Sequence, residues 1–202
     1  MNRYLIPAEN CRVTITVINS RFITTIGHVM STEEAKQFLS QIRQELSDAS
    51  HHVYAFRIGY GNSVVEGMSD DGEPSGTAGP PVMAVLRGST IGDIIIVVTR
   101  YFGGTKLGTG GLVRAYGDAA RAALSALKTQ EKRLWHTLGV EVSYAAYEYT
   151  KRLIARYEGE IEDEDFAGDI TIILRLPVEH FDDFTHQLSE LTAGKVQPVI
   201  LS

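Results

Sequence analysis

DIIIVVTRYFGGTKLGTGGLVRAYGDAARAALSALK (residues 93–128) is the stretch of sequence that decides the fold. Its β-branched run at residues 94–99 is typical of a strand buried on both faces of a sheet. Apolar residues then recur at helical spacing through residues 112–127. Between the two lies a loop with five glycines in nine positions: Gly103, Gly104, Gly108, Gly110 and Gly111. The stretch therefore predicts a strand, a glycine-rich turn and a helix.

A glycine-rich turn of this kind predicts an anion-binding site. Its backbone N–H groups can approach a ligand closely, and the helix N-terminus that follows favours negative charge. Arg100, Lys106 and Arg114 flank the turn and add positive charge. The residues after Gly108 and Gly110 match neither the P-loop nor the dinucleotide fingerprint, so neither nucleotide motif is present. The alternative is that the glycines only permit positive φ and tight strand-helix packing.

A second loop, SDDGEPSGTAGPP (residues 69–81), carries three closely spaced carboxylates: Asp70, Asp71 and Glu73. Carboxylates this close repel one another, which raises a pKa or favours a cation such as Mg²⁺. Turn formation by Asp and Gly explains the same residues. A polar or metal site and a plain turn therefore both remain open for this loop.

The other elements of residues 1–134 surround these two loops. Alternation predicts strands at residues 11–18, 20–29, 51–57 and 64–68, the last two joined by a turn at residues 59–62. Helices are predicted from Ser31, where Glu34 completes a capping box, and from Pro81. The N-terminus of the second helix, at residues 76–79, is a second potential anion site. His51 and His52 are adjacent on a predicted strand, so they point to opposite faces and cannot share one metal ion.

Residues 135–202 predict the β-α-β-β-α-β order of a ferredoxin-like domain. The predicted strands are residues 138–142, 160–165, 170–176 and 196–201, and the helices are residues 149–157 and a segment opened by Pro177. The acidic run at residues 158–165 is typical of a solvated edge strand. Residues 129–134 are predicted to be a polar connector, so the expected domains are residues 1–134 and 135–202.

Composition limits the class of protein. The chain has 202 residues, 44% hydrophobic, and a single cysteine, Cys11, so no internal disulfide can form. It has no apolar run of membrane-spanning length, and its N-terminus lacks the apolar region and cleavage site of a signal peptide, so we expect no membrane contact and a cytoplasmic location. Residues 1–134 hold 14 Lys+Arg and 12 Asp+Glu (net +2), whereas residues 135–202 hold 5 and 13 (net −8). Any nucleic-acid contact should therefore lie in the N-terminal part.

Four segments resemble the hallmark segments of the IMPACT family, and the layout of the chain resembles its bacterial YigZ-like branch. They are NSRFI (residues 19–23), HHVYAFRIG (residues 51–59), SDDGEPSGTAG (residues 69–79) and VVTRYFGGTKLGTGGLVRAY (residues 97–116). The resemblance implies an α+β protein with a ribosomal protein S5 domain-2-like N-terminal domain. It also implies a C-terminal domain like the ferredoxin-like last domain, domain V, of elongation factor G. Eukaryotic members are implicated in translational control, but through an extra domain that this chain lacks. The family pattern names no catalytic residues.

Three functional hypotheses follow. The preferred one is a binding or regulatory factor of translation that recognises RNA or a ribosome-associated component. Its glycine turn and cations would hold phosphates, while Tyr101 and Phe102 would stack on a base. The alternative is an enzyme acting on a phosphorylated small molecule, with Lys106 as anion clamp and the Asp70 segment as metal ligand or general base. That hypothesis requires the two loops to face one cleft. The third is a scaffold that binds a protein partner through the C-terminal domain.

Overall fold

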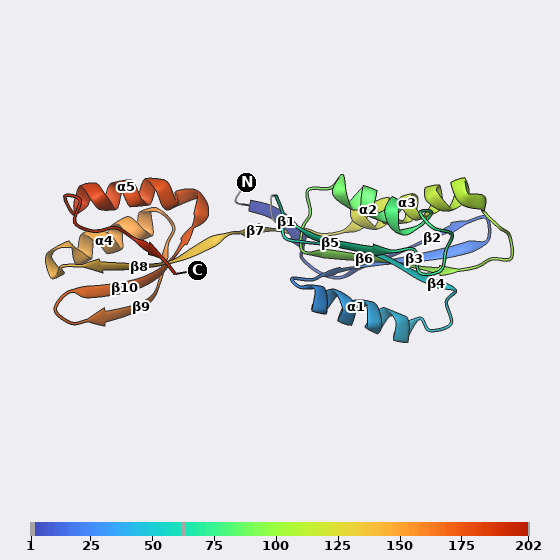
Figure 1. The fold of residues 1–202 in the computed structure, drawn as a ribbon, viewed down its shortest axis with the longest axis horizontal. Coiled ribbons are helices and arrows are strands. Elements are labelled where there is room, and N and C mark those ends of the chain that lie inside the picture. Colours follow the sequence, from blue (N-terminus) through green and yellow to red (C-terminus); the bar gives the residue numbers. More distant parts are fainter. Residues whose placement is uncertain (1–2, 62–63, 202) are drawn as a thin grey trace. The chain divides into compact units, whose positions relative to one another are not determined.

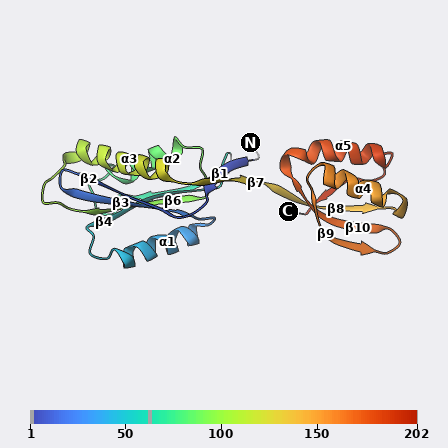
Figure 2. The ribbon, with the colours of Figure 1, turned by 180° about the vertical axis from the view of Figure 1, so that it is seen from behind.

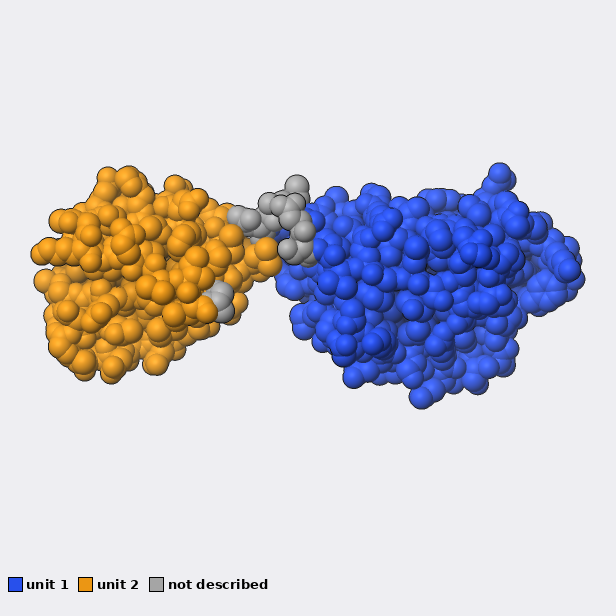
Figure 3. Space-filling view, viewed as in Figure 1, with its two compact units in different colours: residues 1, 3–132 blue, residues 2, 133–202 orange. Residues whose placement is uncertain are grey.

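The computed structural model describes residues 3–61 and 64–201, which form two compact units. The units divide between Lys132 and Arg133, compared with residues 134 and 135 in the sequence prediction (Figure 3). In the part of the chain so described, no helix has both the length and the apolar character needed to cross a membrane. Each unit has its own hydrophobic core.

The first unit is a five-stranded antiparallel sheet with the strand order β2-β3-β6-β4-β5. Helix α1 lies on one face of this sheet, and α2 and α3 lie on the other (Figures 1 and 2). The elements are β1 (Arg3–Pro7), β2 (Cys11–Val17), β3 (Ser20–His28), α1 (Thr32–Glu45), β4 (His51–Ile58), β5 (Val65–Ser69), α2 (Gly79–Arg87), β6 (Ile94–Tyr101), α3 (Gly108–Ala126) and β7 (Thr129–Arg133).

Strand β6 is the centre of the sheet and is buried on both faces, as its β-branched sequence predicts. Ile94, Ile96 and Val98 pack into the core beneath α2 and α3. Ile95 and Val97 pack into the smaller core beneath α1. All five side chains are completely shielded from solvent. A strand between two layers of helices needs apolar side chains at every position, which explains why the run does not alternate.

The remaining predicted strands and the capping box of α1 are also present. Ser31 Oγ accepts a hydrogen bond from the Glu34 backbone N–H (3.1 Å). The Glu34 carboxylate in turn accepts one from the Met30 backbone N–H (2.7 Å). Strands β4 and β5 pair as the expected hairpin. Of the turn predicted between them, Asn62 lies outside the described residues.

Helix α3 begins four residues earlier than the apolar periodicity predicts. Its first residue is Gly108, so Gly108, Gly110 and Gly111 belong to its first turn and not to a preceding loop. The sequence signal was misleading because glycine is a poor helix former and no capping residue marks the start. The chain therefore needs only residues 102–107 to pass from strand to helix.

The predicted polar connector is a strand. Residues Thr129–Arg133 form β7, which pairs with β1 in a two-stranded ribbon. The buried carboxylate of Asp93 holds this ribbon, since it accepts hydrogen bonds from Tyr4 Oη (2.8 Å) and Lys132 Nζ (2.5 Å). Burial alone would raise the pKa of Asp93, but these bonds and one from the Gly59 N–H lower it below its ordinary value. Since β7 owes its conformation to a distant partner, its own sequence shows no strand alternation.

The second unit contains a four-stranded antiparallel sheet with the order β11-β8-β10-β9, and α4 and α5 cover one face of it (Figure 1). Its elements are β8 (Trp135–Val142), α4 (Tyr144–Arg156), β9 (Glu160–Phe166), β10 (Ile170–Pro177), a 3-10 turn (Val178–His180), α5 (Phe181–Leu191) and β11 (Val199–Ile200). Two predictions need correction. Pro177 ends β10 and caps the 3-10 turn that leads into α5, so the α-helix itself begins only at Phe181. The last strand is limited to β11, because residues 195–198 before it have no regular secondary structure.

Strand β9 lies at one edge of this sheet and pairs only with β10. It carries most of the acidic run predicted to protect an edge. A row of carboxylates disfavours pairing with a further strand. The acidic segment therefore has the structural role expected from its sequence.

Candidate functional site

Helix α3 begins without an N-terminal side-chain cap. Its N-cap residue, Leu107, has helical backbone angles, and no side chain among residues 3–61 and 64–201 accepts a hydrogen bond there. The first backbone N–H groups of a helix have no partner within the helix, and they carry partial positive charge. Helix α3 has 19 residues. Its exposed start is therefore a set of unused donors, as the predicted anion site requires.

Four of the five glycines at this strand-to-helix connection are constrained by the fold, and Gly110 is not. A Cβ atom on Gly111 would lie 3.1 Å from the Leu107 Cβ, closer than such atoms usually pack. A Cβ atom on Gly103 would collide with the backbone carbonyl of Asn19 in the β2–β3 turn. Gly104 and Gly108 have φ of 84° and 71°, a region that favours glycine. Gly110 has neither constraint, since a Cβ there would meet nothing within 4 Å. A missing side chain at Gly110 leaves the backbone open to an external ligand.

The start of α3 faces a cavity of about 310 Å³. Arg100 and Lys106 supply its positive charge, and the ring of Phe102 supplies an aromatic face. Gly108 and Thr109, the first two residues of α3, form part of its wall. The complete lining is Glu73, Pro74, Arg100, Phe102, Lys106, Leu107, Gly108, Thr109 and Leu112. We call this cavity the α3 pocket.

Arg100 and Glu73 form a buried ion pair at the base of the α3 pocket. Arg100 Nη1 donates to Glu73 Oε1 over 2.6 Å, and their side chains are only 6% and 3% exposed. Arg100 Nη2 donates to Ser20 Oγ (3.3 Å). Within the described residues, Arg100 Nε is buried and has no hydrogen-bond partner. Glu73 therefore fixes the guanidinium while leaving one of its donors unused.

Tyr116, a buried residue of α3, also binds the Glu73 carboxylate. Its hydroxyl donates to Glu73 Oε1 over 2.7 Å, and its ring packs edge-on against Phe22. Burial, followed by the hydrogen bond to Glu73, raises the pKa of Tyr116 far above its ordinary value, so the hydroxyl remains a donor. His51 Nε2 lies 3.8 Å from the same Glu73 oxygen. The second loop is thereby anchored to both β6 and α3.

Sequence reasoning did not find this network of Glu73, Arg100, Tyr116 and His51. His51 is paired with Arg100 across β4 and β6, which places both side chains on the α3 face of the sheet. His52, one residue on, is paired with Thr99 and contacts its hydroxyl (3.2 Å). The two histidines thus lie on opposite faces, as predicted. Finding the network would have required the strand register, which no local pattern in the sequence reveals.

Asp70 occupies the second anion site predicted from the sequence. Its carboxylate accepts hydrogen bonds from the backbone N–H groups of Gly76 (2.9 Å), Ala78 (2.9 Å) and Gly79 (2.8 Å) at the start of α2. Burial would raise the pKa of Asp70, but these three bonds outweigh it and lower the pKa. The potential anion site predicted at residues 76–79 therefore does hold an anion, but it is the protein's own Asp70 carboxylate and not a ligand.

Asp71 points elsewhere and has its own partners. Its carboxylate accepts from Arg43 Nη2 (2.5 Å) and from the His52 backbone N–H (2.6 Å). Asp70, Asp71 and Glu73 thus do not converge on one ligand position. Within residues 3–61 and 64–201, no group of three or more His, Cys, Asp or Glu side chains could hold a metal ion.

The other predicted site residues are spread around the turn. Gly110, Gly111 and Arg114 line a second cavity of about 340 Å³, which shares Leu107 with the α3 pocket. Tyr101 follows Arg100 on the strand and so points to the opposite face, where its hydroxyl donates to Asp48 (2.7 Å). Of the two predicted stacking rings, only Phe102 is at the α3 pocket, and it is 49% exposed.

Comparison with known proteins identifies both parts of the chain. Residues 18–124 match the Impact N-terminal domain, and residues 140–195 match a domain of unknown function, DUF1949. The chain is 38% identical over 198 residues to "IMPACT family member YigZ" of Escherichia coli strain K12, covering 98% of this chain and 97% of that protein. The chain belongs to the IMPACT family.

Other IMPACT family proteins agree with this assignment. "IMPACT family member YvyE" of Bacillus subtilis is 31% identical over 96% of this chain and 89% of its own length. "Protein IMPACT" of Oryctolagus cuniculus is 30% identical over 51% of this chain and 33% of its own length. A solved structure titled "Crystal structure of an hypothetical protein" is 37% identical, with a TM-score of 0.72, and covers 100% of this chain and 98% of that one.

Proposed function

We propose that this protein is a binding or regulatory factor linked to translation, which recognises RNA or another phosphate-bearing ligand at the N-terminus of α3. The observation that carries the proposal is the uncapped start of a 19-residue helix facing a cavity with a buried arginine. Backbone N–H groups at a helix start bind phosphate oxygens without needing a matching side chain. Membership of the IMPACT family is the basis for the link to translation.

The side chains around the α3 pocket have the chemistry that such a ligand needs. Lys106 is exposed and makes no ion pair within the described residues, so its charge is free to meet a phosphate. Arg100 lines the pocket, and its buried Nε has no hydrogen-bond partner among the described residues. Phe102 presents a half-exposed ring on which a base can stack. Together these groups supply a phosphate contact and a base contact within one pocket.

The distribution of charge supports contact through the first unit only. Residues 1–134 carry a net charge of +2 and residues 135–202 a net charge of −8. An acidic surface repels the phosphate backbone of RNA. We therefore assign RNA contact to the α3 pocket and its surroundings.

A second candidate function is an enzyme that acts on a phosphorylated small molecule. The observation that favours it is that Glu73 and the glycine turn line one cavity, as that hypothesis requires. Glu73 accepts hydrogen bonds from Arg100 and Tyr116, so in such an enzyme its role would be to position Arg100. We prefer the binding function because it requires no chemical reaction in the α3 pocket.

We also propose finer fold assignments and a location. The β-α-β-β-α-β order and the strand order β11-β8-β10-β9 support a ferredoxin-like second unit, similar to domain V of elongation factor G. For the first unit we propose the ribosomal protein S5 domain-2-like fold. The single Cys11, half-buried and free, suits a reducing compartment, so we propose the cytoplasm.

Co-purification tests the proposed function. The full chain is isolated at low and raised salt, with and without nuclease, beside Lys106→Ala and the control Lys36→Ala, which changes an exposed lysine on α1. We expect RNA to accompany the wild type and Lys36→Ala, and to be reduced by salt and by Lys106→Ala. Each phosphate contact contributes about 0.7 to the salt slope for single strands, so Lys106→Ala should lower the slope by about that amount. RNA retained equally by both variants would contradict the proposal, and a bound phosphometabolite would favour the enzyme.

A further inference from the structure

A long groove runs along the outer face of the second unit between α4 and α5. It consists of two cavities of about 730 and 460 Å³ that share Tyr149 and Leu191. The start of α4 lies beside the end of α5 at one end of it, and the helices are therefore antiparallel. Taking a rise of 1.5 Å for each of its 13 residues, α4, which forms one wall, is roughly 20 Å long. We call this groove the α4–α5 groove.

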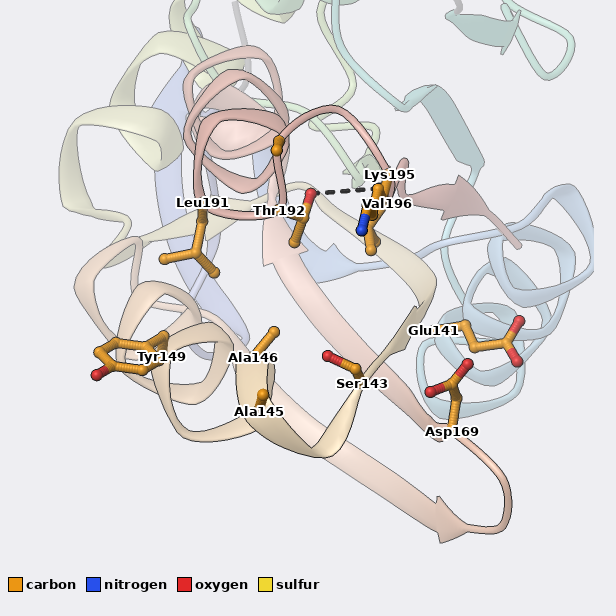
Figure 4. Close-up of a pocket in the computed structure, with 11 residues that line it drawn as sticks. Glu141, Ser143, Ala145, Ala146, Tyr149, Asp169, Leu191, Thr192, Lys195 and Val196 are labelled. Carbon is orange, nitrogen blue, oxygen red and sulfur yellow. Dashed lines mark hydrogen bonds between the residues drawn. The ribbon is translucent and has the colours of Figure 1, made fainter.

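The middle of the α4–α5 groove is apolar and exposed. Tyr149 is 59% exposed and Leu191 is 41% exposed, one on each wall. Figure 4 shows both side chains at one side of the larger cavity. An aromatic ring and an aliphatic side chain on opposite walls of a groove can bury an apolar side chain of a partner protein between them.

One end of the groove is basic. Arg152 and Arg156 stand four residues apart on α4 and line the smaller cavity together with Glu190, so cations outnumber carboxylates there by two to one. Neither makes an ion pair within residues 3–61 and 64–201. Like charges at this spacing repel one another. Both cations thus stand without an ion pair in a part of the chain, residues 135–202, whose net charge is −8.

The other end of the groove is acidic. Glu141 and Asp169 line the larger cavity together with Lys195, so carboxylates outnumber cations there by two to one. Figure 4 shows them on the side of the cavity away from Tyr149 and Leu191. The groove therefore presents, in order along its length, an excess of positive charge, an apolar centre and an excess of negative charge.

We propose that the α4–α5 groove docks a linear segment of a partner protein. The segment carries acidic residues over Arg152 and Arg156, an apolar anchor against Tyr149 and Leu191, and basic residues near Glu141 and Asp169. Charge complementarity at both ends sets its direction, and the apolar centre supplies the attraction. A second copy of this chain fits less well, because a twofold contact would place groove against groove, and two hollows do not fill each other.

A displayed library of random 12-residue peptides, panned against the immobilised full chain, tests this proposal. We expect the enriched sequences to share an apolar centre with acidic residues at one end and Lys or Arg at the other. The best peptide, labelled with fluorescein, is then titrated with each variant by fluorescence anisotropy. Tyr149→Ala and Arg152→Gln should each weaken binding by about tenfold or more, as expected for residues at the centre of a contact. Raised salt should weaken it further.

Two control variants are matched to these changes. Tyr144 is an equally exposed tyrosine on α4 (57%), and Lys151 is a cation on the same helix whose ammonium contacts Tyr147 Oη (3.2 Å). Neither lines the groove. Tyr144→Ala and Lys151→Gln should therefore change affinity by less than about twofold.

Three results would overturn the proposal. The first is the absence of enriched peptides, or enriched peptides that lack the order of charges. The second is equal binding by groove and control variants. The third is a homodimer in sedimentation velocity that Tyr149→Ala dissociates, which would assign the groove to a second copy. Lys106→Ala should leave peptide binding unchanged, so failure here is separate from failure of the proposed function.

Discussion

Glu73→Ala is the substitution that best tests how the α3 pocket is held together. The side chain is almost fully buried, and one of its oxygens receives hydrogen bonds from Arg100 and Tyr116. Removing one partner of a buried ion pair leaves an uncompensated charge, at a cost of about 3–5 kcal/mol. Tyr116 also loses its acceptor, but contributions within one network do not add, so we expect the total to remain about 3–5 kcal/mol.

Conservative variants should give smaller losses. Glu73→Gln keeps an acceptor oxygen but removes the charge, so we expect a loss of about 1.5–3 kcal/mol, the range for a hydrogen bond to a charged group. Tyr116→Phe should cost about 1.5–3 kcal/mol alone. It should cost at least about 0.5 kcal/mol less when Glu73 is already alanine, because the two side chains share one hydrogen bond.

Urea unfolding can assign the loss to one unit. The single tryptophan, Trp135, lies in β8, so its fluorescence follows the second unit, whereas far-ultraviolet circular dichroism follows both. We expect the Glu73 variants to shift the transition of the first unit and to leave that of Trp135 in place. Glu45→Ala is the control, since Glu45 pairs with Arg12 on the surface and such pairs contribute about 0–1 kcal/mol. A Glu73→Ala loss no larger than that of Glu45→Ala would refute the reasoning.

Three further outcomes are expected. Asp70→Ala should destabilise the first unit by about 1–2 kcal/mol at neutral pH, as for loss of a helix cap. Because the folded state lowers the pKa of Asp70, the stability that its carboxylate contributes is fully present above the ordinary pKa of 3.8 and is lost as pH falls through the folded-state pKa. The unfolding free energies of wild type and variant should therefore converge in acid, and a difference that stays constant with pH would contradict this. Gly103→Ala should destabilise by about 1–3 kcal/mol, because its Cβ meets the Asn19 backbone, whereas Gly110→Ala should leave thermal stability unchanged or raise it slightly; equal effects would be inconsistent with the two roles. Millimolar Mg²⁺ should leave the melting temperature unchanged, since Asp70, Asp71 and Glu73 have separate partners, and a rise of several degrees would argue for a metal site.

The sequence predicts most of the regular elements because their patterns are local. The run at Ile94–Tyr101, the cap at Ser31 and the alternation of β2 each depend on neighbouring residues only. Strand β7 was missed for the opposite reason. Its pairing partner, β1, and its anchor, Asp93, lie far away in the chain, so nothing within β7 itself indicates a strand.

The candidate site was predicted only in part, because the sequence shows local patterns but not contacts between distant residues. The glycines and cations of the turn are adjacent in sequence, and the structure brings Arg100, Lys106 and Gly108 to one pocket. The carboxylates were harder to interpret, because spacing along a loop does not reveal the direction of each side chain. Asp70 caps α2, and Glu73 is buried beside Arg100. The direction of Asp70 depends on how its own loop folds back on the start of α2, and that of Glu73 on tertiary contacts with β6 and α3.

The most direct test of the central claim is an NMR titration of the ¹⁵N-labelled full chain with a short single-stranded RNA and, in parallel, with inorganic pyrophosphate. If the uncapped start of α3 binds phosphate, the largest amide shifts should fall at Gly108, Thr109 and Gly110, and Lys106→Ala should weaken the response. No shift with either ligand, or shifts centred on another element and unaffected by Lys106→Ala, would contradict the account.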